Sequence, residues 1–250
     1  MKYIFSILLI GFAVRTFGQI GTFPIKKDSA SKQIDAPLSK PKVTRDFKPS
    51  AIRFGIDLFG LGRTIGSKGF SQYEGQLDID FYRYFFVIDY GMESNEFNSS
   101  EYNYNNSGTY YRVGVQANLT QYNKDRNIIF FGLRYARAAF EDKLSNFIET
   151  NRWGSAQFEV SNNQINANWF EMNLGMKGQV FKNLYVGYTV RFKFAKGTSD
   201  TPDLSPHLIP GFGKYSKGSN LGFNYYIQYR IPFRKKPIPQ KIEKVRRSDA

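Results

Sequence analysis

The fold is decided by residues 221–233, which read LGFNYYIQYRIPF. Every second side chain in this stretch is apolar, and the side chains between them are mostly polar or small. The apolar positions are Leu221, Phe223, Tyr225, Ile227, Tyr229, Ile231 and Phe233. Successive side chains of a β-strand point to opposite faces, so this period of two predicts a strand with one apolar and one polar face.

The same alternation recurs in seven earlier segments, which gives eight predicted strands. The other seven are expected near residues 51–59, 73–81, 84–93, 109–119, 128–140, 167–180 and 184–194. The connections after the second, fourth and sixth strands are short (82–83, 120–127 and 181–183), and the remaining ones are longer (62–72, 94–108, 141–166 and 195–220). This organisation predicts an all-β fold, an antiparallel up-and-down barrel that crosses a membrane, with its turns in the periplasm and its loops outside.

Composition supports a barrel and excludes several other classes of protein. The 250 residues include 24 Phe, 17 Tyr and 2 Trp, yet the mean hydropathy is −0.45, which argues against a bundle of transmembrane helices. The chain has no cysteine, so it has no disulfide, no thiolate metal site and no lipid attached through cysteine. No motif in the sequence predicts a cofactor or a metal ion.

The two ends of the chain differ from its middle. Residues 1–18 have the pattern of a signal peptide, with Lys2 before an apolar run and small residues near Gly18; the alternative is a retained N-terminal anchor. Residues 19–50 contain four prolines, seven basic and three acidic side chains, and we expect a disordered periplasmic segment. We assign 51–233 to the barrel and 234–250 to a disordered basic periplasmic tail, with seven basic and two acidic side chains.

Residues 51–233 resemble the small eight-stranded outer-membrane barrels of the OmpA- and OmpX-like group. The most specific element of the resemblance is an alternating last strand that carries an aromatic residue at its end. Its residues are Tyr225, Ile227, Tyr229, Ile231 and Phe233, although seventeen residues follow Phe233 here. The resemblance implies a Gram-negative outer membrane, a last strand recognised by the barrel insertion machinery, and both termini in the periplasm.

The polar face of the predicted strands carries seven acidic and seven basic side chains. They are Asp57, Glu74, Asp78, Asp80, Asp89, Glu93 and Glu171, with Arg53, Arg112, Arg134, Lys177, Arg191, Lys193 and Arg230. The interior of an eight-stranded barrel is just wide enough to be filled by side chains. We therefore expect these residues to form a buried ion-pair network; a proton or ion path is the alternative.

Three features outside the strands are candidates for function. His207 is the single histidine and lies near Asp200, Asp203 and Ser205, so it is either a general base or a solvated loop residue. The aromatic residues Phe97, Tyr102, Tyr104, Tyr110, Trp153 and Phe158 are expected in an interfacial belt, in strands that extend past the membrane, or in a contact surface. The basic tail is expected to contact anionic lipid or an acidic protein through Arg234, Lys235, Lys236, Lys241, Lys244, Arg246 and Arg247.

These features leave three functional hypotheses. The first is a non-enzymatic outer-membrane barrel with a structural or interaction role, as an accessory subunit of a larger assembly. The second is an outer-membrane enzyme that modifies lipid A and uses His207. The third is a soluble periplasmic lipocalin-like barrel, in which the apolar side chains point inward around a ligand. The expected partners are outer-membrane lipid, the insertion machinery and a protein; an exported chain has no reason to bind nucleic acid.

Overall fold

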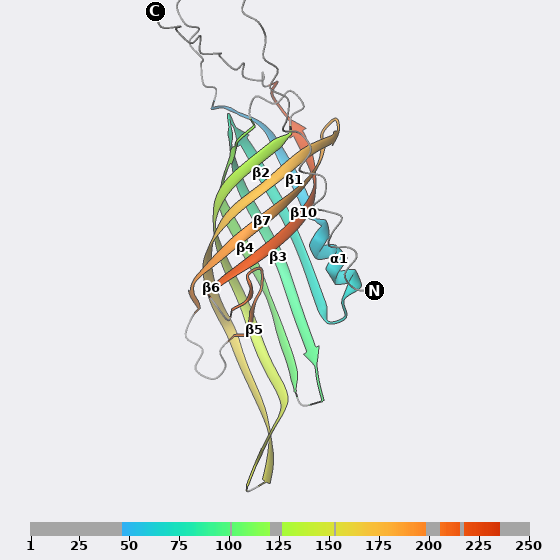
Figure 1. Ribbon diagram of the computed structural model, residues 1–250, viewed down its shortest axis with the longest axis vertical. Coiled ribbons are helices and arrows are strands. Elements are labelled where there is room, and N and C mark those ends of the chain that lie inside the picture. The colour runs from blue at the N-terminus through green and yellow to red at the C-terminus, as the bar shows by residue number, and fades with distance from the viewer. Residues whose placement is uncertain are drawn as a thin grey trace, which may run out of the picture. The chain divides into compact units, whose positions relative to one another are not determined.

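Eight antiparallel strands close into a barrel in the order β1-β10-β7-β6-β5-β4-β3-β2, which confirms the predicted all-β fold (Figure 1). The computed structural model describes residues 47–100, 102–120, 127–152, 154–198, 206–215 and 218–235. The barrel strands are β1 (Pro49–Asp57), β2 (Phe70–Phe81), β3 (Tyr84–Asn98), β4 (Asn103–Asn118), β5 (Ile128–Asn151), β6 (Gly154–Phe181), β7 (Leu184–Thr198) and β10 (Ser219–Pro232). The remaining elements are α1 (Leu58–Gly66), β8 (Leu208–Ile209) and β9 (Gly213–Lys214).

The first and last strands of the barrel pair with each other, from Ala51 opposite Pro232 to Asp57 opposite Tyr226. Pro49 also pairs with Phe81, which precedes the tight turn at Tyr82 and Arg83. The described ends of the barrel strands β1 and β10 therefore lie at the end of the barrel that carries the short turns.

Two of the predicted long loops are wrong, because their residues continue the strands. Strands β3 and β4 pair as far as Asn98 and Asn103. Strands β5 and β6 pair as far as Asn151 and Gly154, and their hairpin extends furthest from the barrel in Figure 1. The alternative expectation named strands that extend past the membrane; of this, the structure shows the strand extensions in both hairpins. The polar Asn and Ser residues here hid the alternation on which strand prediction depends.

Helix α1 begins where strand β1 ends, at Leu58, although the strand was predicted to continue to Phe59. Asp57 ends the strand and caps the helix, since its carboxylate accepts hydrogen bonds from the amides of Phe59 (3.2 Å) and Gly60 (3.1 Å). Strands β2 and β10 both continue beyond the last residues that pair with β1. The helix contacts both strands and fills the place between them that β1 leaves open.

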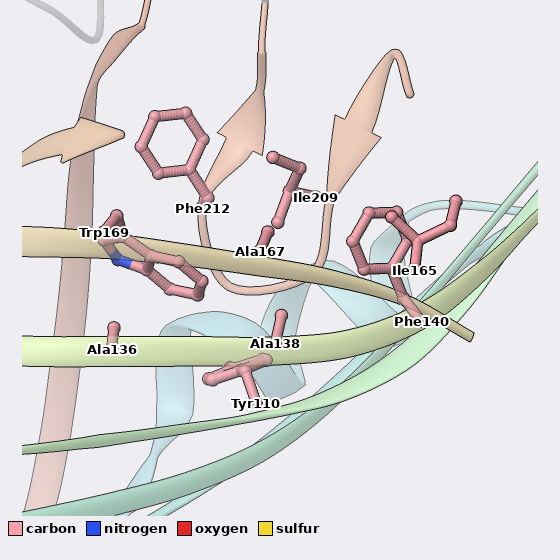
Figure 2. Packing of buried hydrophobic residues seen from close by; sticks show 9 residues of the cluster. All are labelled: Tyr110, Ala136, Ala138, Phe140, Ile165, Ala167, Trp169, Ile209 and Phe212. Carbon is pink, nitrogen blue, oxygen red and sulfur yellow. The ribbon is translucent and has the colours of Figure 1, made fainter. Parts of the chain in front are cut away.

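The connection between β7 and β10 folds back over the barrel as the small β8–β9 hairpin. Two of its side chains, Ile209 and Phe212, pack on β5 and β6 in a cluster of buried residues, as Figure 2 shows. The ring of Phe212 lies edge-on to that of Trp169, with 5.7 Å between the centroids. The other members of the cluster are Tyr110, Ala136, Ala138, Phe140, Ile165 and Ala167. The hairpin therefore closes the barrel at the end away from the short turns.

Within the described residues, no helix has the length and apolar character needed to cross a membrane.

Candidate functional site: the charged interior of the barrel

Six charged side chains meet at the centre of the barrel, and we call them the central charge cluster. The cluster contains Glu74, Asp89, Arg112, Arg134, Glu171 and Arg191, all of them buried. They alternate along their strands with the apolar residues that face outward, which is why they share the interior. Three positive and three negative side chains make the cluster neutral.

The two arginines at the middle of the cluster bridge strands that are not neighbours. Arg191 on β7 binds Glu74 on β2 (3.0 Å) and Glu171 on β6 (3.1 Å). Arg112 on β4 binds the same two carboxylates, Glu74 at 2.8 Å and Glu171 at 3.0 Å. Each arginine thus joins opposite walls of the barrel, and the bridging side chains fill the space between them.

Asp89 is the third carboxylate of the central charge cluster. It accepts charge-assisted hydrogen bonds from Arg134 and, at 3.2 Å, from Arg191. The amide of Gln76 also donates to Asp89 at 2.9 Å. A lone buried charge costs several kcal/mol, so carboxylates at this depth are stable because each one meets a guanidinium group.

A second group of charges lies nearer to the short turns. Asp78 binds the guanidinium of Arg53 (2.7 Å) and the ammonium of Lys177 (2.6 Å). The Arg53 guanidinium lies 4.5 Å from the centroid of the Phe85 ring, a cation–π contact. Asp80 accepts hydrogen bonds from the hydroxyl (2.7 Å) and amide (2.8 Å) of Ser50, and Arg230 approaches it to 3.8 Å.

The β8–β9 hairpin is bound to the charged interior through its backbone. The carbonyl of Gly211 accepts hydrogen bonds from Arg112 (3.0 Å) and Lys193 (2.8 Å), and its amide donates to Glu93 (2.9 Å). The carbonyl of Phe212 accepts a further bond from Lys193 at 3.2 Å. The backbone of the hairpin tip therefore completes the polar network at the end of the barrel away from the short turns. Its side chains Ile209 and Phe212 belong to the apolar cluster.

The structure brings eleven of the fourteen predicted network residues into ion pairs. The other three, Asp57, Glu93 and Lys193, bind backbone and amide groups: Asp57 caps α1 and accepts from Asn224 (2.8 Å), and Glu93 and Lys193 hold the hairpin. Alternation placed these side chains inside the barrel but did not show which partner each one takes.

Several uncharged residues of the network were missed by the sequence analysis. The hydroxyl of Tyr110 donates to Glu74 (2.7 Å) and accepts from Gln72 (3.1 Å), and the indole of Trp169 donates to Glu171 (2.8 Å). Tyr226 also donates to Glu74. Each of these residues has the same parity along its strand as the charged residues, and this parity was the available signal.

Tyr104 and Tyr110 correct one prediction about the aromatic residues. Both were considered for an interfacial belt or a contact surface, but they are 7% and 1% exposed and point into the barrel. Phe97, Tyr102 and Phe158 are exposed, as an outer surface requires. Trp153 lies outside the described residues.

His207 lies beside β4, at the rim of the barrel away from the short turns. Its ring is perpendicular to that of Tyr104, with 6.4 Å between centroids. Tyr104 donates to the carboxylate of Asp142 (2.9 Å), which also accepts from Asn106. Asn106 in turn donates to the carbonyl of Leu208 (3.1 Å) and so ties the hairpin to the wall. Burial raises the pKa of Asp142, and these hydrogen bonds oppose that rise.

The predicted histidine site is therefore described only in part. Asp200, Asp203 and Ser205 lie outside the described residues, and the acidic residue that the structure brings near His207 is Asp142. In the part of the chain that the structure describes, no group of three or more acidic or histidine side chains is arranged to hold a metal ion.

The predicted insertion signal lies on β10 and just beyond it. Tyr225, Tyr229 and Ile231 are exposed on the outer face of the barrel, Ile227 is half-buried, and Phe233 follows the end of the strand. Arg234 donates to the carbonyl of Lys48 (2.7 Å) and so joins the two described ends of the chain. Lys235 is the last described residue; Lys236, Lys241, Lys244, Arg246 and Arg247 lie outside the described residues, as do the predicted signal peptide and residues 19–46.

Comparison with known proteins identifies one family for this architecture. The model of DUF6048, a domain of unknown function, matches residues 1–236 and thus nearly the whole chain. No curated protein and no solved structure matches the chain. The closed eight-stranded barrel with its charged interior belongs to a member of the DUF6048 family.

Proposed function

We propose that this protein is an outer-membrane β-barrel that does not conduct and that serves as a structural or interaction protein, with a role in a larger outer-membrane assembly. The observation that carries the proposal is the inverted distribution of polarity: charged side chains fill the interior, and large apolar side chains cover the exterior. Such a surface is unfavourable in water and favourable in lipid.

The apolar exterior has the height that a bilayer requires. On β6 it runs from Phe170 to Val180, a span of eleven residues with apolar side chains or glycine at every second position. A transmembrane β-strand needs about 9–11 residues. At the Phe170 end of this span, the next outward-facing residue of β6 is Asn168, and on the neighbouring strand Arg137 comes after Tyr135. Polar residues therefore begin at this outer border of the belt.

The interior supports a barrel without a conducting pore. The bridges from Arg112 and Arg191 cross the barrel, and the β8–β9 hairpin lies over them. The side chains of both arginines are at most 1% exposed. These contacts favour structural packing over the alternative of an ion path.

The lipocalin-like alternative requires the opposite orientation of the strands. Its apolar side chains would surround a ligand, but Leu133, Phe170 and Tyr229 are each more than half exposed on the outside. Asp78, Asp89 and Arg191 are fully buried inside instead. This orientation disfavours a soluble ligand-binding barrel.

The interaction role is supported by the β5–β6 hairpin. Fourteen residues of β5, from Ala138 to Asn151, continue beyond the outer border of the belt. At about 3.3 Å per residue, this extension is roughly 45 Å long when measured along the strand. The hairpin carries polar and charged side chains such as Lys143 and Glu159, which form an exposed ion pair at 2.5 Å. Its length and polarity suit contact with another protein outside the bilayer.

Three measurements test this proposal. We expect the protein in the outer-membrane fraction, with faster migration of the unboiled form in detergent gels, which is typical of folded barrels. Reconstituted in phosphatidylcholine vesicles, it should give no conductance above that of protein-free vesicles. Affinity purification from detergent-solubilised outer membranes should recover a protein partner, and a variant without residues 141–162 should lose it. Recovery in the soluble periplasmic fraction, or steady single-channel currents, would refute the proposal.

A second candidate function is modification of lipid A with His207 as a general base. It is favoured by the position of His207 at the outer rim, near Asp142 and Tyr104. Replacing His207 by Ala and comparing the lipid A species of cells that express either form tests it. Unchanged lipid A in the two strains excludes this enzyme.

A further inference from the structure

Helix α1 packs on the barrel with its small and polar side. Gly60 is buried beside Asp57 and Gln72. Four residues later, the hydroxyl of Thr64 accepts a hydrogen bond from the amide of Gln72 (2.8 Å). Residues four apart lie on the same face of a helix, so Gly60 and Thr64 define the face that contacts the barrel.

The apolar side of α1 therefore points away from the barrel. Leu58 and Ile65 are seven residues apart and therefore lie on one helix face, which points away from Gly60 and Thr64, while Leu61 lies between the two faces and is half-buried. Ile65 is 89% exposed, and Leu58 is also exposed. Water does not favour such a face, whereas an amphipathic helix that lies along a bilayer buries this side in lipid.

The apolar face of the helix is continuous with the apolar exterior of the strands. The ring of Phe59 meets that of Phe223 on β10 edge-on, with 5.4 Å between their centroids. Phe223 itself is exposed on the outer face of the barrel. The helix thus extends the surface that the proposed function places in lipid, at the barrel end away from the short turns.

Two exposed basic side chains lie in and just after the helix. Arg63 and Lys68 are both exposed, and residues 58–73 contain no acidic residue. The Arg63 guanidinium lies over the ring of Phe70, with 3.8 Å to its centroid, and this contact holds the charge beside the wall of the barrel. Basic side chains next to an inserted apolar face are suited to bind the phosphate groups of a lipid.

We infer that α1, with Phe59, Arg63 and Lys68, is a binding surface for a phosphorylated lipid of the outer leaflet. The acyl chains pack on Leu58 and Ile65, and the phosphate groups contact Arg63 and Lys68. This inference rests on the proposed membrane insertion. It adds an element of the barrel wall that recognises a particular lipid headgroup as well as the apolar phase.

The absence of cysteine from the chain makes a site-specific test straightforward. Single variants I65C, L174C and K143C are labelled with an environment-sensitive fluorophore and reconstituted in phosphatidylcholine vesicles. Leu174 marks the apolar exterior of β6, and Lys143 marks the exposed hairpin. We expect the emission at residue 65 to match the apolar signal of residue 174 and to differ from the aqueous signal of residue 143.

The same experiment separates the inference from the function on which it rests. An aqueous signal at residue 65 together with an apolar signal at residue 174 overturns the inference and leaves membrane insertion intact. Aqueous signals at both residues refute membrane insertion itself.

Recognition of phosphate is tested with the double variant R63Q/K68Q, with K143Q as the matched control. The probe is diphosphorylated lipid A in phosphatidylcholine vesicles, and heat-modifiable migration verifies that each variant folds. Each basic side chain near an anionic surface contributes about 1 kcal/mol, so the double variant is expected to bind roughly 30-fold more weakly. K143Q is expected to bind like the wild type. Equal binding by R63Q/K68Q and K143Q, or displacement of lipid A by an equal concentration of inorganic phosphate, overturns the inference.

Discussion

Replacing Glu74 by Gln tests whether the central charge cluster stabilises the barrel. Glu74 is buried and binds two guanidinium groups, those of Arg112 (2.8 Å) and Arg191 (3.0 Å). Gln has nearly the same shape, but the hydroxyls of Tyr110 and Tyr226 donate to different oxygens of Glu74, and the amide of Gln keeps only one of these two acceptors. The substitution therefore removes the charge and one acceptor oxygen, and it leaves three guanidinium groups with two carboxylates.

The expected loss follows from that uncompensated charge. Breaking a buried ion pair by removing one partner costs about 3–5 kcal/mol. With a urea dependence of about 2 kcal/mol per molar, a 4 kcal/mol loss lowers the unfolding midpoint by about 2 M. K143Q is the control: it breaks an ion pair whose side chains are 48% and 59% exposed, and we expect a change within about 0.5 kcal/mol.

Tryptophan fluorescence of the barrel in detergent micelles reports the unfolding. The Trp169 indole donates to Glu171, so it lies between the central charge cluster and the apolar cluster, and W153F leaves it as the single tryptophan. The double variant E74Q/R191M restores equal numbers of both charges and should be more stable than E74Q alone. A loss of less than about 1 kcal/mol in E74Q would refute the reasoning, because the buried charges would then be hydrated or screened.

Three further predictions concern the half of the barrel that lies away from the short turns. Since burial raises the pKa of Asp142, the folded protein keeps a proton that the unfolded chain releases above pH ~4. The stability of the wild type relative to D142N should therefore fall as pH rises from there through the folded pKa. Urea unfolding from pH 4 to 8 measures this difference in stability, and a rise with pH contradicts the prediction. A Cβ at Gly91 overlaps the phenol end of Tyr110, so G91A should displace the Tyr110 hydroxyl from Glu74. The free energy of unfolding in urea should fall by about 1–3 kcal/mol. An unchanged unfolding midpoint counts against this packing. F212A removes a large ring from the apolar cluster and should lower the free energy of unfolding by up to about 3–5 kcal/mol. Hydrogen exchange at the Gly211 amide, which donates to Glu93, should accelerate. Unchanged exchange would show that the hairpin does not depend on this ring.

The strands of the barrel were predictable because a closed sheet repeats one simple rule. Residues such as Phe192 and Arg191 alternate between an apolar exterior and a polar interior, and this period of two is visible in the sequence. Where the exterior becomes polar, as in the β5–β6 hairpin, the contrast disappears and the strand ends were misplaced. Helix α1 was missed for the opposite reason: Leu58 and Phe59 continue the apolar character of β1, and the capping by Asp57 depends on the strand ending there.

The pairing inside the barrel was beyond sequence reasoning for a geometric reason. Which residues share a level across the barrel depends on the stagger between strands, and no local pattern encodes it. Glu74 and Arg191 are 117 positions apart and meet only after the sheet closes. Tyr110 was considered for an interfacial belt, a strand extension or a contact surface, whereas its hydroxyl gives it a place beside Glu74.

The closure between β1 and β10 has a consequence for how the chain assembles. A sheet that still lacks its last strand holds Glu74 and Asp78 on β2 but has not brought every guanidinium and ammonium partner into place, and it has open edges. In the proposed membrane setting, such an intermediate cannot rest within lipid, since its carboxylates need either water or their partners. Insertion and completion of the ring are therefore expected as one concerted event, and a chain that stops before residue 219 should be rejected and degraded instead of persisting as a smaller barrel.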